Sequence, residues 1–131
     1  MSLLDDHDLV GSVPYELSYL SNLTTLDLSR NNLHGTIPNT YETLHNLEIL
    51  NLGYNSFHGP IPDNIFDMTS LNTLLLMNNR ISGYIPDLTD NASKMYEINL
   101  SNNLLTGTLP TSLLLFPSLG EYEILDDEYV G

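Results

Sequence analysis

The sequence of 131 residues contains no cysteine and very few cationic side chains. Without cysteine the chain has no disulfide, no thiolate metal ligand and no cysteine nucleophile, although the cysteine count does not indicate a cellular compartment. Arg30, Arg80 and Lys94 stand against 17 Asp and Glu, and the formal net charge is −14. Such a charge repels a phosphate backbone, so we expect no nucleic-acid partner.

Long apolar runs are also absent. No segment approaches the ~18 to 20 consecutive apolar residues of a membrane-spanning helix. Residues 1–9 are acidic where a signal peptide is first basic and then apolar. We therefore expect no membrane insertion by this segment. With 41% apolar residues, the chain can still bury a core, and its length fits a single domain over residues 1–131.

A repeat of 24 residues dominates the sequence. Full copies follow one another without insertion, between partial copies at both ends. The full copies are residues 23–46, 47–70, 71–94 and 95–118, and the partial copies are residues 1–22 and 119–131. Counting from Leu23 as position 1, apolar residues recur at positions 1, 4, 6, 11 and 15, with asparagine at 9, glycine at 13 and proline at 16. Because the sequence opens and stops within a repeat, we expect a fragment of about five repeats or a weakly capped short protein.

This pattern, L-x-x-L-x-L-x-x-N-x-L-x-G-x-I-P, resembles the plant-type leucine-rich repeat of receptor kinases, receptor-like proteins and polygalacturonase inhibitors. The resemblance covers essentially the whole chain. It implies an α/β solenoid: a right-handed superhelix with a parallel concave β-sheet and a mostly extended or 3₁₀ convex side. Since the same repeat serves many ligands, the resemblance specifies the fold far more than the function.

Elementary chemistry leads to the same architecture. The alternation at positions 4 to 6 is typical of a short strand with one buried face, and strands joined by identical crossovers run parallel. Asparagine at position 9 can pair with buried backbone groups, which predicts a hydrogen-bonded ladder. Glycine at position 13 suits a positive φ or a close approach between neighbours. Proline at position 16 excludes a helix through that point, so we expect a mostly extended convex side. Residues 87–94 lack two large apolar side chains, so we expect an irregular convex segment there.

No set of side chains has the spacing of a catalytic site, which predicts a non-enzymatic protein without a cofactor. His34 and His58 share position 12 of adjacent repeats, and a spacing of ~5 Å would be compatible with a shared metal. Two ligands without a third make a weak site, so we predict no metal. The acidic run at residues 121–128 lacks the spacing of a calcium loop. Together with Asp5, Asp6 and Asp8, it discourages end-to-end stacking, so we expect a monomer.

Positions 3, 5, 7 and 8 are predicted to point away from the core and to line the concave surface. In the two central repeats they include apolar and aromatic side chains that core packing does not require, with a polar rim around them. Patches of this kind mark interaction sites, which predicts a protein or peptide ligand. The predicted site comprises Arg30, Ile49, Asn51, Tyr54, Leu75, Met77, Asn78, Asn99 and Asn102. An ice-binding surface is not favoured, because its column of threonine at position 14 is broken at Pro60 and Tyr84.

Three acceptor sequons for N-glycosylation begin at Asn22, Asn91 and Asn99, and they favour an extracellular or cell-surface location. We expect Asn91 to be the most accessible, because it lies in the irregular segment. The resulting hypothesis is a recognition module of a secreted or cell-surface receptor-like protein, with any signalling carried outside this sequence. The alternatives are a soluble inhibitor of a cell-wall-degrading enzyme and an intracellular leucine-rich repeat scaffold.

Overall fold

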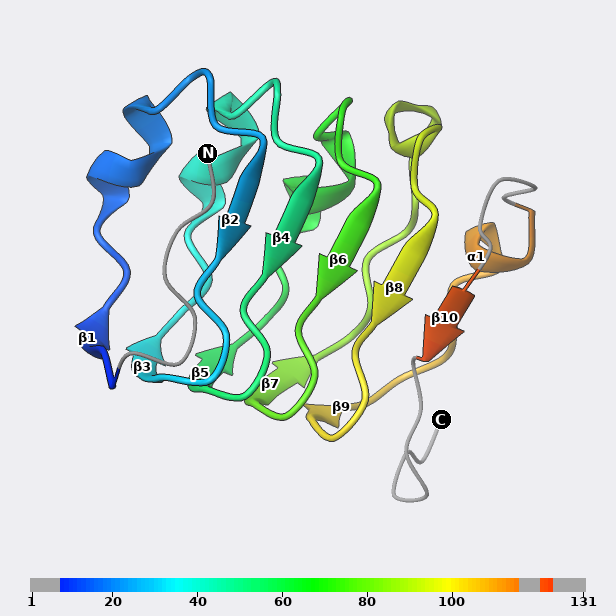
Figure 1. Ribbon diagram of the computed structural model, residues 1–131. Coiled ribbons are helices and arrows are strands. Elements are labelled where there is room, and N and C mark those ends of the chain that lie inside the picture. Colours follow the sequence, from blue (N-terminus) through cyan, green and yellow to red (C-terminus); the bar gives the residue numbers. More distant parts are fainter. Residues whose placement is uncertain (1–7, 116–120, 124–131) are drawn as a thin grey trace.

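The computed structural model of the chain describes residues 8–115 and 121–123. Its strands form two parallel five-stranded sheets (Figure 1). The concave sheet contains, in spatial order, β2 (Thr25–Asp27), β4 (Ile49–Asn51), β6 (Thr73–Leu75), β8 (Glu97–Asn99) and β10 (Glu121–Glu123). The second sheet contains β1 (Val10–Ser12), β3 (Asn32–Gly35), β5 (Ser56–Gly59), β7 (Arg80–Gly83) and β9 (Leu104–Leu105). The predicted solenoid with its parallel concave sheet is confirmed.

Short helices complete each turn of the solenoid. They are the 3₁₀ helices η1 (Tyr15–Tyr19), η2 (Asn39–Thr43), η3 (Asp63–Asp67) and η4 (Asp90–Ala92), followed by the single α-helical turn α1 (Ser112–Leu115). Prolines 14, 38 and 62 immediately precede η1 to η3, where a missing backbone N–H costs no helical hydrogen bond. The predicted irregularity at residues 87–94 is confirmed, since η4 has 3 residues where the other 3₁₀ helices have 5.

Within the described ranges, no helix is long and apolar enough to cross a membrane.

The second sheet was not expected as a sheet, because the sequence predicts only extended backbone there. Its register also differs from that of the concave sheet. The concave sheet pairs equivalent positions, such as Leu50 with Leu74. In the second sheet, His34 lies opposite Ser56 and His58 lies opposite Arg80, so equivalent positions are shifted by two residues. The two histidines are therefore not direct neighbours across the strands, and the expected ~5 Å spacing is wrong.

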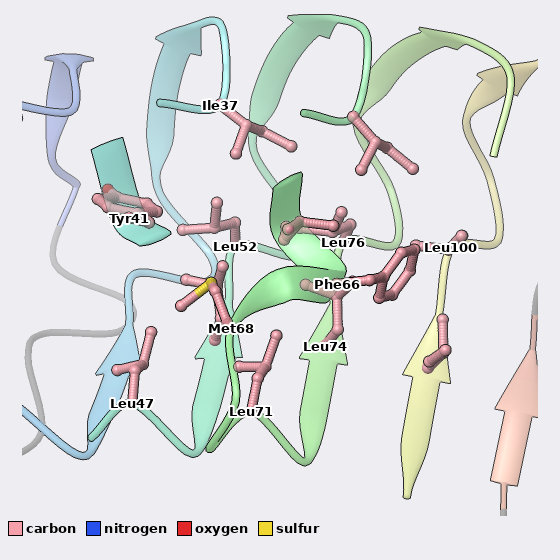
Figure 2. Packing of buried hydrophobic residues seen from close by; sticks show 14 of the residues in the cluster. Ile37, Tyr41, Leu47, Leu52, Phe66, Met68, Leu71, Leu74, Leu76 and Leu100 are labelled. Carbon is pink, nitrogen blue, oxygen red and sulfur yellow. The ribbon is translucent and has the colours of Figure 1, made fainter. Parts of the chain in front are cut away.

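One continuous core runs through all described repeats. It is formed by the predicted apolar positions, by position 22 and by residues of the convex segments such as Tyr41, Ile65 and Phe66. Figure 2 shows how side chains from neighbouring turns interdigitate. Strands β2, β4, β6 and β8 bury their central residues completely, at 0% exposure for Leu26, Leu50, Leu74 and Ile98. Because each turn packs only against the next, the stability of a repeat depends on its neighbours.

The predicted asparagine ladder is confirmed. Asn55 Oδ1 accepts a hydrogen bond from the backbone N–H of Leu33 at 3.0 Å. Asn55 Nδ2 donates to the carbonyls of Leu28 at 2.9 Å and Leu52 at 3.1 Å. Asn79 and Asn103 repeat this arrangement one and two turns further along. Each amide therefore satisfies backbone groups of two adjacent repeats that the core would otherwise leave unpaired.

Glycine at position 13 serves two needs at once. At Gly59 the backbone φ is +79°, and a Cβ there would lie 3.1 Å from Cγ2 of Thr36 in the preceding repeat. The position thus combines a left-handed backbone with close approach between turns, and both conditions favour glycine.

Tyr41 carries a polar group into the apolar core. Its ring is 2% exposed, its hydroxyl has no hydrogen-bond partner among the described residues, and burial raises its pKa strongly. A buried, unpaired hydroxyl costs about 1 to 3 kcal/mol. We expect Tyr41→Phe to raise the free energy of unfolding by about 1 kcal/mol in urea denaturation.

The control for this change is Tyr84→Phe. The hydroxyl of Tyr84 lies at the surface and donates to Asp63 Oδ1 at 2.9 Å. Its removal should change stability by less than about 0.5 kcal/mol. A loss of stability in Tyr41→Phe would show that the buried hydroxyl has a partner such as an ordered water.

Candidate functional site

The candidate site lies on the outer face of the concave sheet. In strands β2, β4, β6 and β8, the central residue is buried and its two neighbours are half-buried. Positions 3 and 5 therefore face away from the core, as predicted. The register places Ile49 beside Thr73 and Asn51 beside Leu75. Ile49 and Leu75 therefore lie diagonally across two adjacent strands.

Position 7 brings Met77 into contact with the neighbouring repeat. A Cβ at Gly53 would lie only 2.7 Å from Met77 Sδ, so the thioether lies directly over this glycine. Gly53 is buried and Met77 is half-buried. Because Gly53 has no side chain, Met77 lies across the end of strand β4. We call Ile49, Tyr54, Leu75 and Met77 the concave patch.

Polar residues at position 5 are held by local hydrogen bonds. Asn51 Oδ1 accepts from the backbone N–H of Gly53 at 3.1 Å. Asn99 Oδ1 accepts from the backbone N–H of Ser101 at 3.1 Å and from its hydroxyl at 2.7 Å. These are Asx-type turns that finish the strands. The sequence predicts Asn51 and Asn99 as ligand contacts, whereas in the structure the side-chain oxygen of each accepts hydrogen bonds from its own strand end.

Position 8 has a left-handed backbone in each described full repeat, which the sequence analysis missed. Arg30, Tyr54, Asn78 and Asn102 have φ between 56° and 58°. The N–H groups of the first three donate to carbonyls of the following repeat at 2.9 to 3.0 Å, which fixes this conformation. Asparagine tolerates left-handed φ, so its occurrence at Asn78 and Asn102 was the available signal. We call these four residues the left-handed row.

Two members of the left-handed row contact each other. The guanidinium carbon of Arg30 lies 4.5 Å from the centroid of the Tyr54 ring, which is a cation–π arrangement. Arg30 is exposed, and Tyr54 is 42% exposed. The structure thus joins a cation and an aromatic ring at the edge of the concave patch.

The three sequons differ in their surroundings. Asn22 is exposed in the turn before β2, and Asn91 is exposed in η4. Asn99 is half-buried on β8, and the hydroxyl of Ser101, the third residue of its sequon, donates to the Asn99 side chain. Only the first two therefore present their amides at the open surface.

No group of three or more His, Asp or Glu side chains in residues 8–115 and 121–123 is arranged to hold a metal ion. Most of the acidic run at residues 121–128 lies outside the described residues, as do residues 5–7. The described part of the run, β10, pairs with β8 as an ordinary strand of the concave sheet.

Comparison with known proteins bears directly on this architecture. Family models described as leucine-rich repeat match residues 21–81 and 94–116. The chain belongs to the leucine-rich repeat family. No match was found among curated proteins.

Solved structures similar to this leucine-rich repeat chain include plant receptor ectodomains. The ectodomain of the receptor kinase SOBIR1 from Arabidopsis thaliana has a TM-score of 0.85 and 29% identity, over 94% of this chain and 67% of that one. The Arabidopsis HAESA ectodomain, in complex with an N-terminally extended IDA peptide hormone, has a TM-score of 0.87 and 32% identity, over 92% and 21%. A plant ice-binding protein has a TM-score of 0.78 and 35% identity, over 82% and 35%. The chain thus spans two thirds of the first ectodomain and about a fifth of the second.

Proposed function

We propose that this leucine-rich repeat chain is a recognition module of a secreted or cell-surface receptor-like protein, and that it binds a peptide or protein ligand on the concave patch. The observation that carries the proposal is the composition of the concave face. Positions 5 and 7 are polar in the first and fourth full repeats, with Asp27 and Ser29 in the first and Asn99 and Ser101 in the fourth. The third repeat has Leu75 and Met77 at these positions. The HAESA ectodomain supports it, because that similar structure was solved with a peptide ligand.

The concave patch can bind a ligand without any change to the core. Its side chains leave the core complete, because the buried residue of each strand lies on the opposite face. A ligand that covers them gains about 25 cal/mol per Å² of apolar surface. The polar rim of Arg30, Asn78 and Asn102 can pair with the ligand's backbone or carboxylates.

Replacing Tyr54 and Met77 together with alanine is expected to weaken ligand binding by about 2 kcal/mol, a roughly 30-fold increase in Kd. The ligand would be isolated by pull-down from secreted proteins of the source and the affinity measured by titration calorimetry. Tyr19→Ala is the matched control, because Tyr19 is 73% exposed on η1, outside the concave sheet. If the double variant binds as the parent does, the ligand binds elsewhere. If it unfolds, Tyr54 and Met77 serve the fold, and the concave patch is not the site.

Ice binding is less well supported, although one similar structure is an ice-binding protein. Position 14 forms an exposed column of Ser12, Thr36, Pro60, Tyr84 and Thr108. Proline and tyrosine interrupt this column at adjacent turns. A flat threonine array is therefore missing, and recognition of a peptide or protein explains more of the surface.

Glycan occupancy tests the proposed location. We expect Asn22 and Asn91 to carry glycans in the native protein and Asn99 to be bare, because Asn99 is half-buried and hydrogen-bonded within its own sequon. Mass spectrometry of glycopeptides from the native source measures all three. Occupied sites agree with the receptor-like protein and with the soluble inhibitor of a cell-wall-degrading enzyme. Three bare sites would favour the intracellular scaffold.

A further inference from the structure

The left-handed row contains two residues that its backbone does not favour. Left-handed φ is routine for glycine and accessible to asparagine, but it brings Cβ of other L-residues too close to a carbonyl oxygen. Asn78 and Asn102 suit this conformation, while Arg30 and Tyr54 adopt it with φ of 58° and 57°. Backbone strain of this kind points to function when the surrounding structure holds it in place.

The scaffold does hold both residues. The N–H of Arg30 donates to the carbonyl of Gly53 at 3.0 Å, and the N–H of Tyr54 donates to the carbonyl of Met77 at 2.9 Å. Both side chains therefore project from fixed points on adjacent turns. The guanidinium carbon of Arg30 lies over the Tyr54 ring, 4.5 Å from its centroid, so the ring restricts the positions that the guanidinium can take.

Among the described residues, no acidic side chain pairs with the positive charge of Arg30. In the part of the chain that the structure describes, its guanidinium contacts the Tyr54 ring and pairs with no carboxylate. The nearby carboxylate of Asp27 is engaged, since Oδ1 accepts from the Ser29 hydroxyl at 2.7 Å and Oδ2 accepts from Asn51 Nδ2 at 3.3 Å. Asp8 has a left-handed φ of 54° one turn earlier and also forms no ion pair with Arg30.

We propose that Arg30 and Tyr54 form an anchor for a carboxylate of the ligand that covers the concave patch. A guanidinium presents planar, parallel N–H donors that match the two oxygens of a carboxylate, and stacking on a ring leaves those edge donors available. Tyr54 also belongs to the concave patch. The carboxylate of the ligand should therefore lie next to an apolar side chain of that ligand. It comes either from a peptide C-terminus or from an Asp or Glu side chain. The inference rests on the proposed function and names the chemistry of its ligand.

Two small probes test the anchor directly. N-acetyl-L-phenylalanine carries a carboxylate beside an apolar ring, and its primary amide lacks the charge. We expect the carboxylate to shift the Arg30 Nε–H resonance in a saturable way, and the amide to do so at least tenfold more weakly. Arg30→Gln should abolish the response, while Arg80→Gln, which removes the exposed arginine of β7, should leave it unchanged. Equal binding of both probes, or equal binding by the Arg30→Gln variant, overturns the anchor.

Two peptides separate the sources of the carboxylate. In acetyl-Phe-Glu-Phe-amide the only carboxylate is a side chain, and acetyl-Phe-Gln-Phe-amide is its neutral control. Binding of the glutamate peptide with at least the affinity of N-acetyl-L-phenylalanine assigns the anchor to side-chain carboxylates. Weaker binding assigns it to a C-terminus. If neither the glutamate peptide nor N-acetyl-L-phenylalanine binds, the anchor is refuted.

Strain supplies an independent test that does not need a ligand. Arg30→Asn and Tyr54→Asn give these positions the residue found at Asn78 and Asn102. Each change is expected to raise Tm by about 3 °C while removing carboxylate binding. Unchanged or lowered Tm in both variants removes the strain argument, and carboxylate binding that persists in Arg30→Asn removes the anchor.

The anchor and the proposed function can fail separately. If the native ligand depends on Tyr54 and Met77 but binds the Arg30→Asn variant normally, the concave patch is the binding site and the anchor is wrong. If the carboxylate probe requires Arg30 while the native ligand is indifferent to the concave patch, the anchor is correct and the proposed function is wrong.

Discussion

Replacing Asn79 with alanine is expected to lower the free energy of unfolding by about 3 kcal/mol or more. Asn79 Oδ1 accepts from the N–H of Phe57 at 3.0 Å, and its Nδ2 donates to the carbonyls of Leu52 at 3.0 Å and Leu76 at 3.1 Å. Alanine leaves the N–H of Phe57 without its partner, which costs about 1 to 3 kcal/mol. The carbonyls of Leu52 and Leu76 each lose one of two asparagine donors and keep Asn55 and Asn103, and each lost hydrogen bond costs about 0.5 to 1.5 kcal/mol. Urea denaturation of parent and variant measures the difference.

Asn64→Ala is the matched control for this prediction. Asn64 also makes two side-chain hydrogen bonds to the preceding repeat, with the carbonyl of Asn39 at 3.1 Å and with Glu42 Oε2 at 2.8 Å. These bonds lie at the surface, where water replaces them, so the cost should stay below about 0.5 kcal/mol. Similar costs for Asn64→Ala and Asn79→Ala would mean that the ladder is not a principal source of stability.

The features that sequence analysis predicted are those in which one side chain meets one periodic requirement. Asparagine at position 9 pairs with the backbone, glycine at position 13 takes a left-handed φ, and leucine at positions 4 and 6 fills the core. Each requirement recurs every 24 residues, so the pattern alone gives the concave strands, the ladder and the solenoid.

The second sheet could not be predicted in the same way. Its strands have few residues. Strand β1 buries none of its side chains, and β3 and β5 each bury only one, Leu33 and Phe57. No alternating pattern marks such a strand. Its shift of two residues follows from how successive turns stack, and no side chain in the sequence encodes it. For this reason the spacing of His34 and His58 was misjudged.

The candidate site was predicted in outline only. The alternation of the strands gives the outward face, but the contacts within that face depend on the distances between turns. Met77 lies over Gly53 because one repeat lacks a side chain where the next has a long one. The contact of Arg30 with Tyr54 depends on the left-handed row. Asn78 and Asn102 were the only indication of this row in the sequence, and the sequence analysis did not predict it.

These contacts also explain why the concave patch stands out from the rest of the face. In the first and fourth full repeats, a polar residue at position 5 forms a hydrogen bond with serine at position 7, as in Asp27 with Ser29 and Asn99 with Ser101. In the third repeat, leucine and methionine replace that pair, so the strand end has no such turn. Leu75 and Met77 therefore lie where the other full repeats have a hydrogen-bonded turn.

Phe57→Ala is expected to lower the free energy of unfolding by about 3 to 5 kcal/mol, because it removes a ring from a fully buried site and leaves a cavity. Phe57 is 0% exposed and is among the largest fully buried side chains of the core. Phe57→Leu is the control, since the equivalent position is Leu33 in the first full repeat and Leu105 in the fourth. Its cost should stay near about 1 kcal/mol. If alanine and leucine cost the same, packing at this position is not limiting.

The two stability predictions meet at one hydrogen bond, because the N–H of Phe57 donates to Asn79 Oδ1. A double variant, Phe57→Ala with Asn79→Ala, should therefore lose less stability than the two single variants combined. Collapse around a smaller side chain lets this N–H find a new partner or water, and contacting residues couple by about 0.5 to 3 kcal/mol. Strict additivity in urea denaturation would show that the ladder and the core stabilise the solenoid independently.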